Sequence, residues 1–212
     1  MSSSPLLEAK DLAGHRGAMP LFANLGFRVD AGTVLFVTGR NGSGKTTLLR
    51  MLAGLTTPAA GEIRLRGETV GPLDEALRAS VLFSGHAAAL KDELTTEENL
   101  DALVRLAGAR ASCDAIRAVL DELSLGPQRL LPARVLSAGQ RRRIGLARLR
   151  LVRRPLWVLD EPLTALDAAG NESLVASLRS HLDDGGAAIV ATHQPLDVAA
   201  GRTHALALGS AA

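Results

Sequence analysis

The chain has 212 residues, of which 47% are hydrophobic and only 2% aromatic, and its 24 Lys and Arg nearly balance 22 Asp and Glu for a net charge of +2. This length supports one sizeable core and is too short for two full α/β domains. Because nucleic-acid binders cluster positive charge and supply aromatic stacking platforms, we expect no nucleic-acid partner.

The N-terminal third predicts antiparallel strands followed by the start of an α/β core. Apolar and polar positions alternate over the first thirty residues, which predicts strands with a turn near 14–17. An apolar run at 34–37 leads into a Gly-rich loop, and residues 46–54 predict a helix that stops at a glycine. A strand and turn are expected over 61–70, and another buried strand at 81–83.

Helical patterns dominate from about 91 to 154. Thr95 and Glu98 have the spacing of a capping box ahead of an apolar pattern. A second helix is predicted from about 112 to 123, and a third begins at Ser137, again with a Gln three residues later. This stretch therefore predicts an inserted helical subdomain.

Two apolar runs, 156–159 and 187–191, return the chain to parallel strands. We predict an α/β fold, organised as a single domain over all 212 residues. Residues 1–83 and 155–212 are expected to form the core with its N-terminal antiparallel β subdomain, and residues 84–154 the helical subdomain.

The segment from Gly39 to Thr46 matches the phosphate-loop pattern G-x-x-x-x-G-K-[ST] between a predicted strand and helix. Backbone N–H groups of such a loop surround phosphate, Lys45 meets the β and γ oxygens, and Thr46 offers its hydroxyl to Mg²⁺. The residues expected to bind ATP here are Gly39, Arg40, Asn41, Gly42, Ser43, Gly44, Lys45, Thr46 and Thr47.

Two acidic residues and a histidine follow the predicted strands. Asp160 ends an apolar strand and is expected to reach the Mg²⁺ shell, while Glu161 is the candidate general base for an attacking water. His193 follows the 187–191 strand at the carboxyl end of the sheet, where ligands of such folds bind, and is expected to contact the γ-phosphate. The predicted catalytic residues are therefore Lys45, Glu161 and His193.

A second Ser-Gly turn opens the helix at Ser137, within Leu136-Ser137-Ala138-Gly139-Gln140. The N-terminus of a helix binds phosphate, and the phosphate loop already provides one such helix start. We therefore interpret the second one as a contact to a nucleotide that another copy of the chain holds. We therefore predict half of an ATP-driven clamp, with Ser137, Ala138, Gly139 and Gln140 meeting the partner's ATP. The three arginines that follow, 141–143, are interpreted as a solvated helix face rather than a lipid or nucleic-acid contact.

Other features exclude several kinds of site. Cys113 is the single cysteine, so no internal disulfide or multi-cysteine metal site is expected. The five histidines lack close ligand spacing, and no C-x-x-C-H haem attachment motif occurs. No run approaches 18 apolar residues, and the start lacks a signal-peptide pattern, so membrane-spanning parts are expected in another polypeptide.

The motif LSAGQ, Asp160-Glu161-Pro162, the segment 164–167 and His193 together resemble the nucleotide-binding subunit of ABC transporters, over nearly the whole chain. The resemblance implies a P-loop NTPase (RecA-like) core that binds ATP and Mg²⁺. It also implies that Ser137 and Gly139 touch the γ-phosphate held by a second copy, and that Asp167 crosses the dimer interface.

Two departures narrow the resemblance. His86 stands where most transporters place a Gln that couples to the membrane subunit, and LSAGQ replaces LSGGQ. With Leu94-Thr95, Pro155-Leu156-Trp157 and residues 192–196, the chain is similar to the CcmA family, the haem-exporter ATP-binding proteins of cytochrome c biogenesis. This implies two copies at the cytoplasmic face of the inner membrane beneath CcmB-like and CcmC-like subunits, with ATP hydrolysis coupled to haem export or haem-chaperone release.

Three questions stay open at this level. Arg16 stands where the family usually offers an aromatic ring to adenine, and a guanidinium can either stack on a base or remain in solvent. A non-transport ABC protein acting on nucleic acid or ribosomes is the alternative function, although the long coiled-coil insertion or fused second copy usual there is absent from the sequence. A nucleotide-binding scaffold without hydrolysis is a third reading, opposed by Glu161 and His193.

Overall fold

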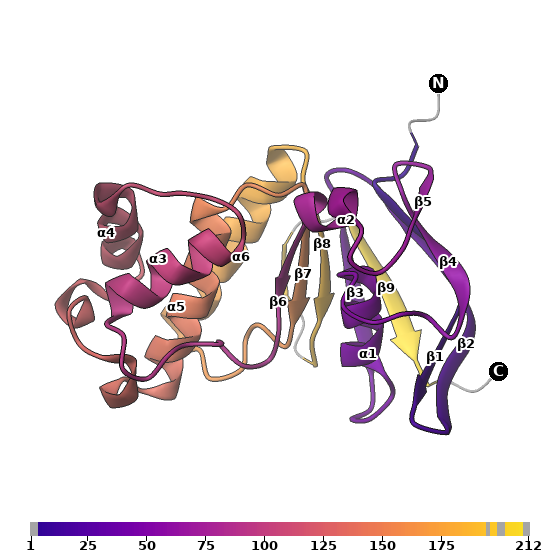
Figure 1. The fold of residues 1–212 in the computed structure, drawn as a ribbon, viewed down its shortest axis with the longest axis horizontal. Helices are drawn as coiled ribbons and strands as arrows, with labels where there is room; N and C mark the ends of the chain where they lie inside the picture. Colours follow the sequence, from indigo (N-terminus) through magenta and orange to yellow (C-terminus); the bar gives the residue numbers. More distant parts are fainter. Residues whose placement is uncertain (1–3, 194–195, 199–201, 210–212) are drawn as a thin grey trace. The chain divides into compact units, whose positions relative to one another are not determined.

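A computed structural model describes residues 4–193, 196–198 and 202–209 (Figure 1). Contacts group the chain into two units, a core unit (1–83, 154–162 and 178–212) and a helical unit (84–153 and 163–177). The elements are β1 (Leu7–Arg16), β2 (Met19–Val29), β3 (Val34–Gly39), α1 (Lys45–Leu52), β4 (Ala60–Leu65), β5 (Glu68–Val70), α2 (Glu75–Ser80), β6 (Val81–Ser84), α3 (Thr96–Leu106), α4 (Cys113–Glu122), η1 (Gly126–Gln128), η2 (Ala133–Val135), α5 (Ala138–Leu151), β7 (Leu156–Asp160), α6 (Ala168–Asp183), β8 (Ala187–Ala191) and β9 (Thr203–Leu208).

Two sheets build the core unit. An antiparallel sheet has the order β2-β1-β4-β5, and a five-stranded sheet has the order β6-β7-β8-β3-β9, in which β3, β7, β8 and β9 pair in parallel. Every residue of β7 and β8 is buried, as expected for strands inside a parallel sheet. The predicted antiparallel start and the α/β fold are thereby confirmed. In Figure 1 the arrows of β7, β8 and β9 point toward the end of the unit where the loop before α1 lies.

Helix α1 joins the two sheets into one core. Leu48, Leu49 and Leu52 pack in the same cluster as Leu7 of β1 and Ile189 of β8, and all five side chains are essentially inaccessible to solvent. The first turn of α1 follows Gly44, which has a left-handed φ of 99° and offers no side-chain cap. The backbone N–H groups at this helix start are therefore left for a ligand.

His181 of α6 has a structural role in the core unit. Its ring stacks on Trp157 of β7, with centroids 3.9 Å apart and planes 5° from parallel, and its Nε2 donates to the Ala187 carbonyl at 3.1 Å. Burial is the largest influence on this imidazole and lowers the pKa of His181, so the neutral ring is favoured.

Helices α3, α4 and α5 build most of the helical unit. Both predicted capping boxes are confirmed: Thr95 and Glu98 exchange side-chain and backbone hydrogen bonds before α3, and Ser137 and Gln140 do so before α5. Asn99 is buried and bonds the backbone of the preceding loop, accepting from the Lys91 N–H at 2.8 Å and donating to nearby carbonyls. The loop before α3 is therefore tied to the helix itself.

Some elements were not predicted. Strand β9 reads Thr-His-Ala-Leu-Ala-Leu, mostly small and exposed side chains that carry little strand signal, and α2 and α6 were also missed. Residues 163–177 group with the helical unit, whereas the sequence patterns placed 155–212 in the core; domain boundaries stay a prediction. Gln194 and Pro195, quoted for the family resemblance, lie outside the described residues. Among the described helices, none is both long and apolar enough to span a bilayer.

Candidate active site

The phosphate loop wraps the ammonium group of Lys45. This side chain is 7% exposed, and its Nζ donates to the carbonyls of Gly39 at 2.8 Å and Arg40 at 3.4 Å. Gly39 has a φ of 145°, and a Cβ there would meet the Leu208 carbonyl and the Ser43 hydroxyl. A side chain at Gly39 would therefore displace the loop from β9 and from its own turn.

A hydroxyl and a carboxylate meet beside the loop. Thr46 Oγ1 donates to Asp160 Oδ2 at 2.8 Å, and Asp160 is 2% exposed at the last position of β7. Hydroxyl and carboxylate oxygens are ligands that Mg²⁺ prefers, so these two residues fit a magnesium ion. The described residues contain no group of three or more His, Cys, Asp or Glu with metal-binding geometry, and such a site would therefore need phosphate and water oxygens as well.

Glu161 leaves the strand in a strained conformation. Its φ is 46°, in the left-handed region, while its N–H donates to the Ala191 carbonyl at 2.9 Å. Such strain costs on the order of 1–3 kcal/mol and persists only where the surroundings enforce it. Here it turns the carboxylate out of the strand and toward His193.

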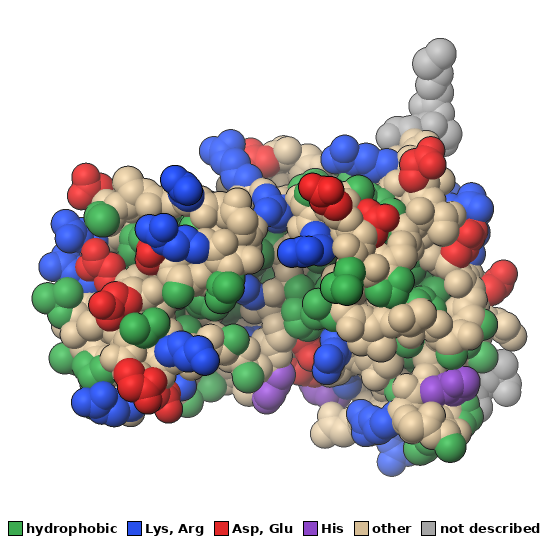
Figure 2. Space-filling view, viewed as in Figure 1, with side chains coloured by type: hydrophobic (Ala, Val, Ile, Leu, Met, Phe, Trp, Pro, Cys, Tyr) green, Lys and Arg blue, Asp and Glu red, His purple; other side chains and the backbone are tan. Residues whose placement is uncertain are grey.

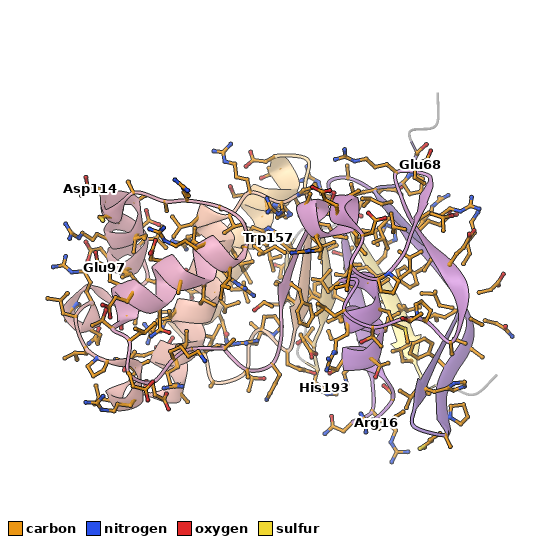
Figure 3. The ribbon with its side chains drawn as sticks, viewed as in Figure 1. Arg16, Glu68, Glu97, Asp114, Trp157 and His193 are labelled. Atoms are coloured by element: carbon orange, nitrogen blue, oxygen red, sulfur yellow. The ribbon has the colours of Figure 1, made fainter. Side chains whose placement is uncertain are left out.

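His193 joins three other residues of the site. Its Nε2 lies 3.0 Å from Asn41 Oδ1, 3.1 Å from Lys45 Nζ and 3.2 Å from Glu161 Oε1. This nitrogen can donate to an oxygen or accept from the ammonium, but not both in one protonation state. The imidazole, which is exposed at the position labelled in Figure 3, can therefore exchange partners among Asn41, Lys45 and Glu161.

One contact and one residue of the site were not singled out from the sequence: the pairing of Asn41, itself a predicted ATP-binding residue, with His193, and the ring of Phe22. The part of Asn41 as a partner of His193 depends on a contact across 152 residues. Phe22 of β2 lies against both Gly14 and Gly44, because a Cβ on either glycine would meet its ring. Phe22 thus supports the loop from the antiparallel sheet. Arg16 ends β1 with an exposed side chain, and Figure 3 shows it at the same end of the core unit as His193.

The remaining predicted site residues belong to the helical unit. Ser137 caps α5, with Ala138, Gly139 and Gln140 in its first turn, and a Cβ on Gly139 would stand 2.8 Å from the Ala165 carbonyl. Asp167 Oδ1 accepts a hydrogen bond from the Gly170 N–H at 2.9 Å. The side chain of His86, in the same unit, is exposed to solvent. The structure therefore gathers Lys45, Thr46, Asp160, Glu161 and His193 in the core unit and orders the others within the helical unit.

The interpretation of residues 141–143 as a solvated face is wrong for Arg142. Its side chain is 4% exposed. Arg141 and Arg143 are partly covered and pair with Asp92 at 2.7 Å and Asp167 at 3.6 Å. A guanidinium can be buried where backbone carbonyls accept its hydrogen bonds. A run of charged residues therefore does not by itself predict that every side chain in it is exposed to solvent.

Comparisons with known proteins agree with this geometry. Residues 22–164 match the family model described as ABC transporter. The chain is 44% identical to the cytochrome c biogenesis ATP-binding export protein CcmA of Dechloromonas aromatica over 96% of this chain and all of that protein. It is 49% identical to the protein of the same name from Aromatoleum aromaticum, over 92% and 91%. A solved structure titled as the ATP binding subunit of an ABC transporter aligns at 28% identity and a TM-score of 0.78, covering 89% of this chain and 79% of the other.

Proposed function

We propose, because this chain belongs to the CcmA family of ABC transporter ATP-binding proteins, that it is the ATP-hydrolysing subunit of a membrane complex for c-type cytochrome biogenesis. Because the chain belongs to this family of ATP-hydrolysing proteins, it is an ATPase. The observation that carries the catalytic assignment is the cluster in which His193 lies within 3.2 Å of Asn41, Lys45 and Glu161. We take residues 1–212 as one ABC ATP-binding domain.

In the proposed reaction, the loop and Lys45 hold the β- and γ-phosphates and neutralise their charge. For this, Lys45 exchanges its loop carbonyl partners for phosphate oxygens when ATP binds, before the water attacks. Glu161 accepts a proton from the water that attacks the γ-phosphorus, while the bond from this phosphorus to the β–γ bridging oxygen breaks and ADP leaves. His193 contacts the γ-phosphate and keeps Glu161 oriented through the 3.2 Å contact.

Thr46 and Asp160 are the residues we propose to hold Mg²⁺, on the strength of their 2.8 Å contact. When bound, the ion would neutralise negative charge on the phosphates. The burial of Asp160 keeps its carboxylate in one orientation, and Thr46 stands at the start of α1, where the helix dipole also favours phosphate.

We further propose that two copies act together at the cytoplasmic face of the inner membrane. The exposed Ser137 and neighbouring Gly139 would complete the ATP site of the other copy, and Asp167 would lie at their interface. His86 would couple the pair to CcmB-like and CcmC-like membrane subunits. Figure 2 shows both signs of charge interspersed on the visible face, so this face lacks the clustered basic patch typical of nucleic-acid binding.

Co-purification tests the function. A C-terminally tagged chain, extracted gently from native membranes, is expected to bring small hydrophobic membrane subunits and cytochrome c maturation proteins, with ATPase activity lost in a Glu161→Gln control. Recovery only from the soluble fraction with nucleic acid or ribosomes attached would contradict the proposal and favour a non-transport ABC ATPase.

Arg16→Ala is expected to raise the KM for ATP, because the exposed guanidinium at the end of β1 is free to stack on adenine. Steady-state ATPase assays with Arg28→Ala, which alters an exposed arginine at the other end of the same sheet ribbon, give the matched control. An unchanged KM for Arg16→Ala would assign Arg16 to solvent.

A further inference from the structure

A buried guanidinium in the helical unit has no part in the chemistry above. Arg142 of α5 donates from Nη1 to the carbonyls of Gly85 at 2.8 Å and His86 at 3.0 Å. A guanidinium donates hydrogen bonds and accepts none, so backbone carbonyls suit it when it is buried. Arg142 therefore fixes the backbone at the turn that carries His86.

A second contact holds the same segment against the same face of α5. Gly145 lies one helical turn after Arg142, and a Cβ there would stand 3.2 Å from Ala88 Cβ. The residue after Ala88, Ala89, has a left-handed φ of 47°, which costs a non-glycine residue free energy and persists only where the surroundings enforce it. Helix α5 therefore contacts the 85–89 segment at two places, the Gly85 and His86 carbonyls and Ala88.

The charge environment makes this placement costly. Arg148 of the same helix is partly buried; burial first, and then the charge of Arg142, lower the pKa of Arg148. Burying the Arg142 cation beside this second cation is unfavourable unless its hydrogen bonds compensate. An apolar side chain at 142 would avoid that cost, but it would give the Gly85 and His86 carbonyls no donor.

We infer that Arg142 is a positioning residue that couples the Gly85–His86 turn to the first turn of α5. The inference rests on the proposed function, in which Ser137 and Gly139 meet ATP held by the partner copy. Arg142 stands one turn after Ala138, so a displacement of the helix start moves the two carbonyls with it. His86 would then shift when two copies close on ATP.

Hydrogen exchange in the full chain tests the coupling. With Glu161→Gln as the parent, to slow turnover, MgATP is added and amide exchange is followed in residues 39–47, 85–89 and 137–141. We expect ATP to slow exchange in all three segments, at 85–89 by roughly 5- to 150-fold, the usual range for coupling between two sites. Arg142→Met is expected to abolish the response at 85–89 alone.

Two further variants separate positioning from folding. Arg142→Lys retains a donor for one carbonyl and should restore part of the response, whereas Arg141→Met, which loses Asp92 and the Ala133 carbonyl, should leave it intact. A retained response at 85–89 in Arg142→Met would overturn the inference, as would a simultaneous loss in all three segments with a lower Tm. Protection at 39–47 without any at 137–141 in the parent would overturn the two-copy proposal and this inference with it.

Discussion

Glu161→Gln is expected to slow ATP turnover by about 10²- to 10⁴-fold, the usual contribution of a general base, while ATP binding is retained. The amide is isosteric with the carboxylate but cannot accept the proton of the attacking water. It can still place an oxygen near His193 Nε2, so the 3.2 Å contact and the loop geometry should survive. Single-turnover hydrolysis together with equilibrium nucleotide binding would measure the two effects separately.

Glu68→Gln is the matched control, because Glu68 is an exposed residue of β5 in the same unit (Figure 3). It should hydrolyse ATP at the parental rate. If Glu161→Gln kept full turnover, Glu161 would not be the base. A loss of both turnover and binding would instead indicate that the strained Glu161 backbone supports the nucleotide site structurally.

Local patterns in the sequence predicted much of the fold and of the site. The phosphate loop and both capping boxes are defined by residues three to seven positions apart, so their chemistry is readable along the chain. Asp160 and His193 were found because parallel strands bring their carboxyl ends to one edge, where the register places Asp160 opposite Ala191.

Contacts between distant segments could not be predicted in this way. Arg142 reads as part of a charged run, and only the tertiary fold provides the Gly85 and His86 carbonyls that receive it. Phe22 reads as one of several apolar strand residues, yet it lies against both Gly14 and Gly44. Periodicity identifies which face of an element is apolar, but it does not identify the residue that the face will meet.

The stack of His181 on Trp157 leads to the second large effect, on stability. Gly186→Ala would place a methyl group on Cε1 and Nε2 of His181, and the ring cannot move aside because Trp157 covers its face and Ala187 holds Nε2. Overpacking of this kind costs about 1–3 kcal/mol. For a chain of this size that lowers Tm by roughly 2–12 °C, taking 2–4 °C for each kcal/mol. Fluorescence of Trp157, the single tryptophan, reports the unfolding.

Gly185→Ala is the neighbouring control, and it separates backbone strain from steric overlap. Gly185 has a φ of 82°, and a methyl group there would meet nothing within 4 Å, so its cost of about 1–2 kcal/mol comes from the left-handed backbone alone. Repeating both substitutions in a His181→Ala background completes a double-mutant cycle. With the ring removed, Gly186→Ala should lose most of its cost while Gly185→Ala keeps its own. Equal costs of Gly186→Ala in the two backgrounds would mean that His181 does not determine the need for glycine at 186.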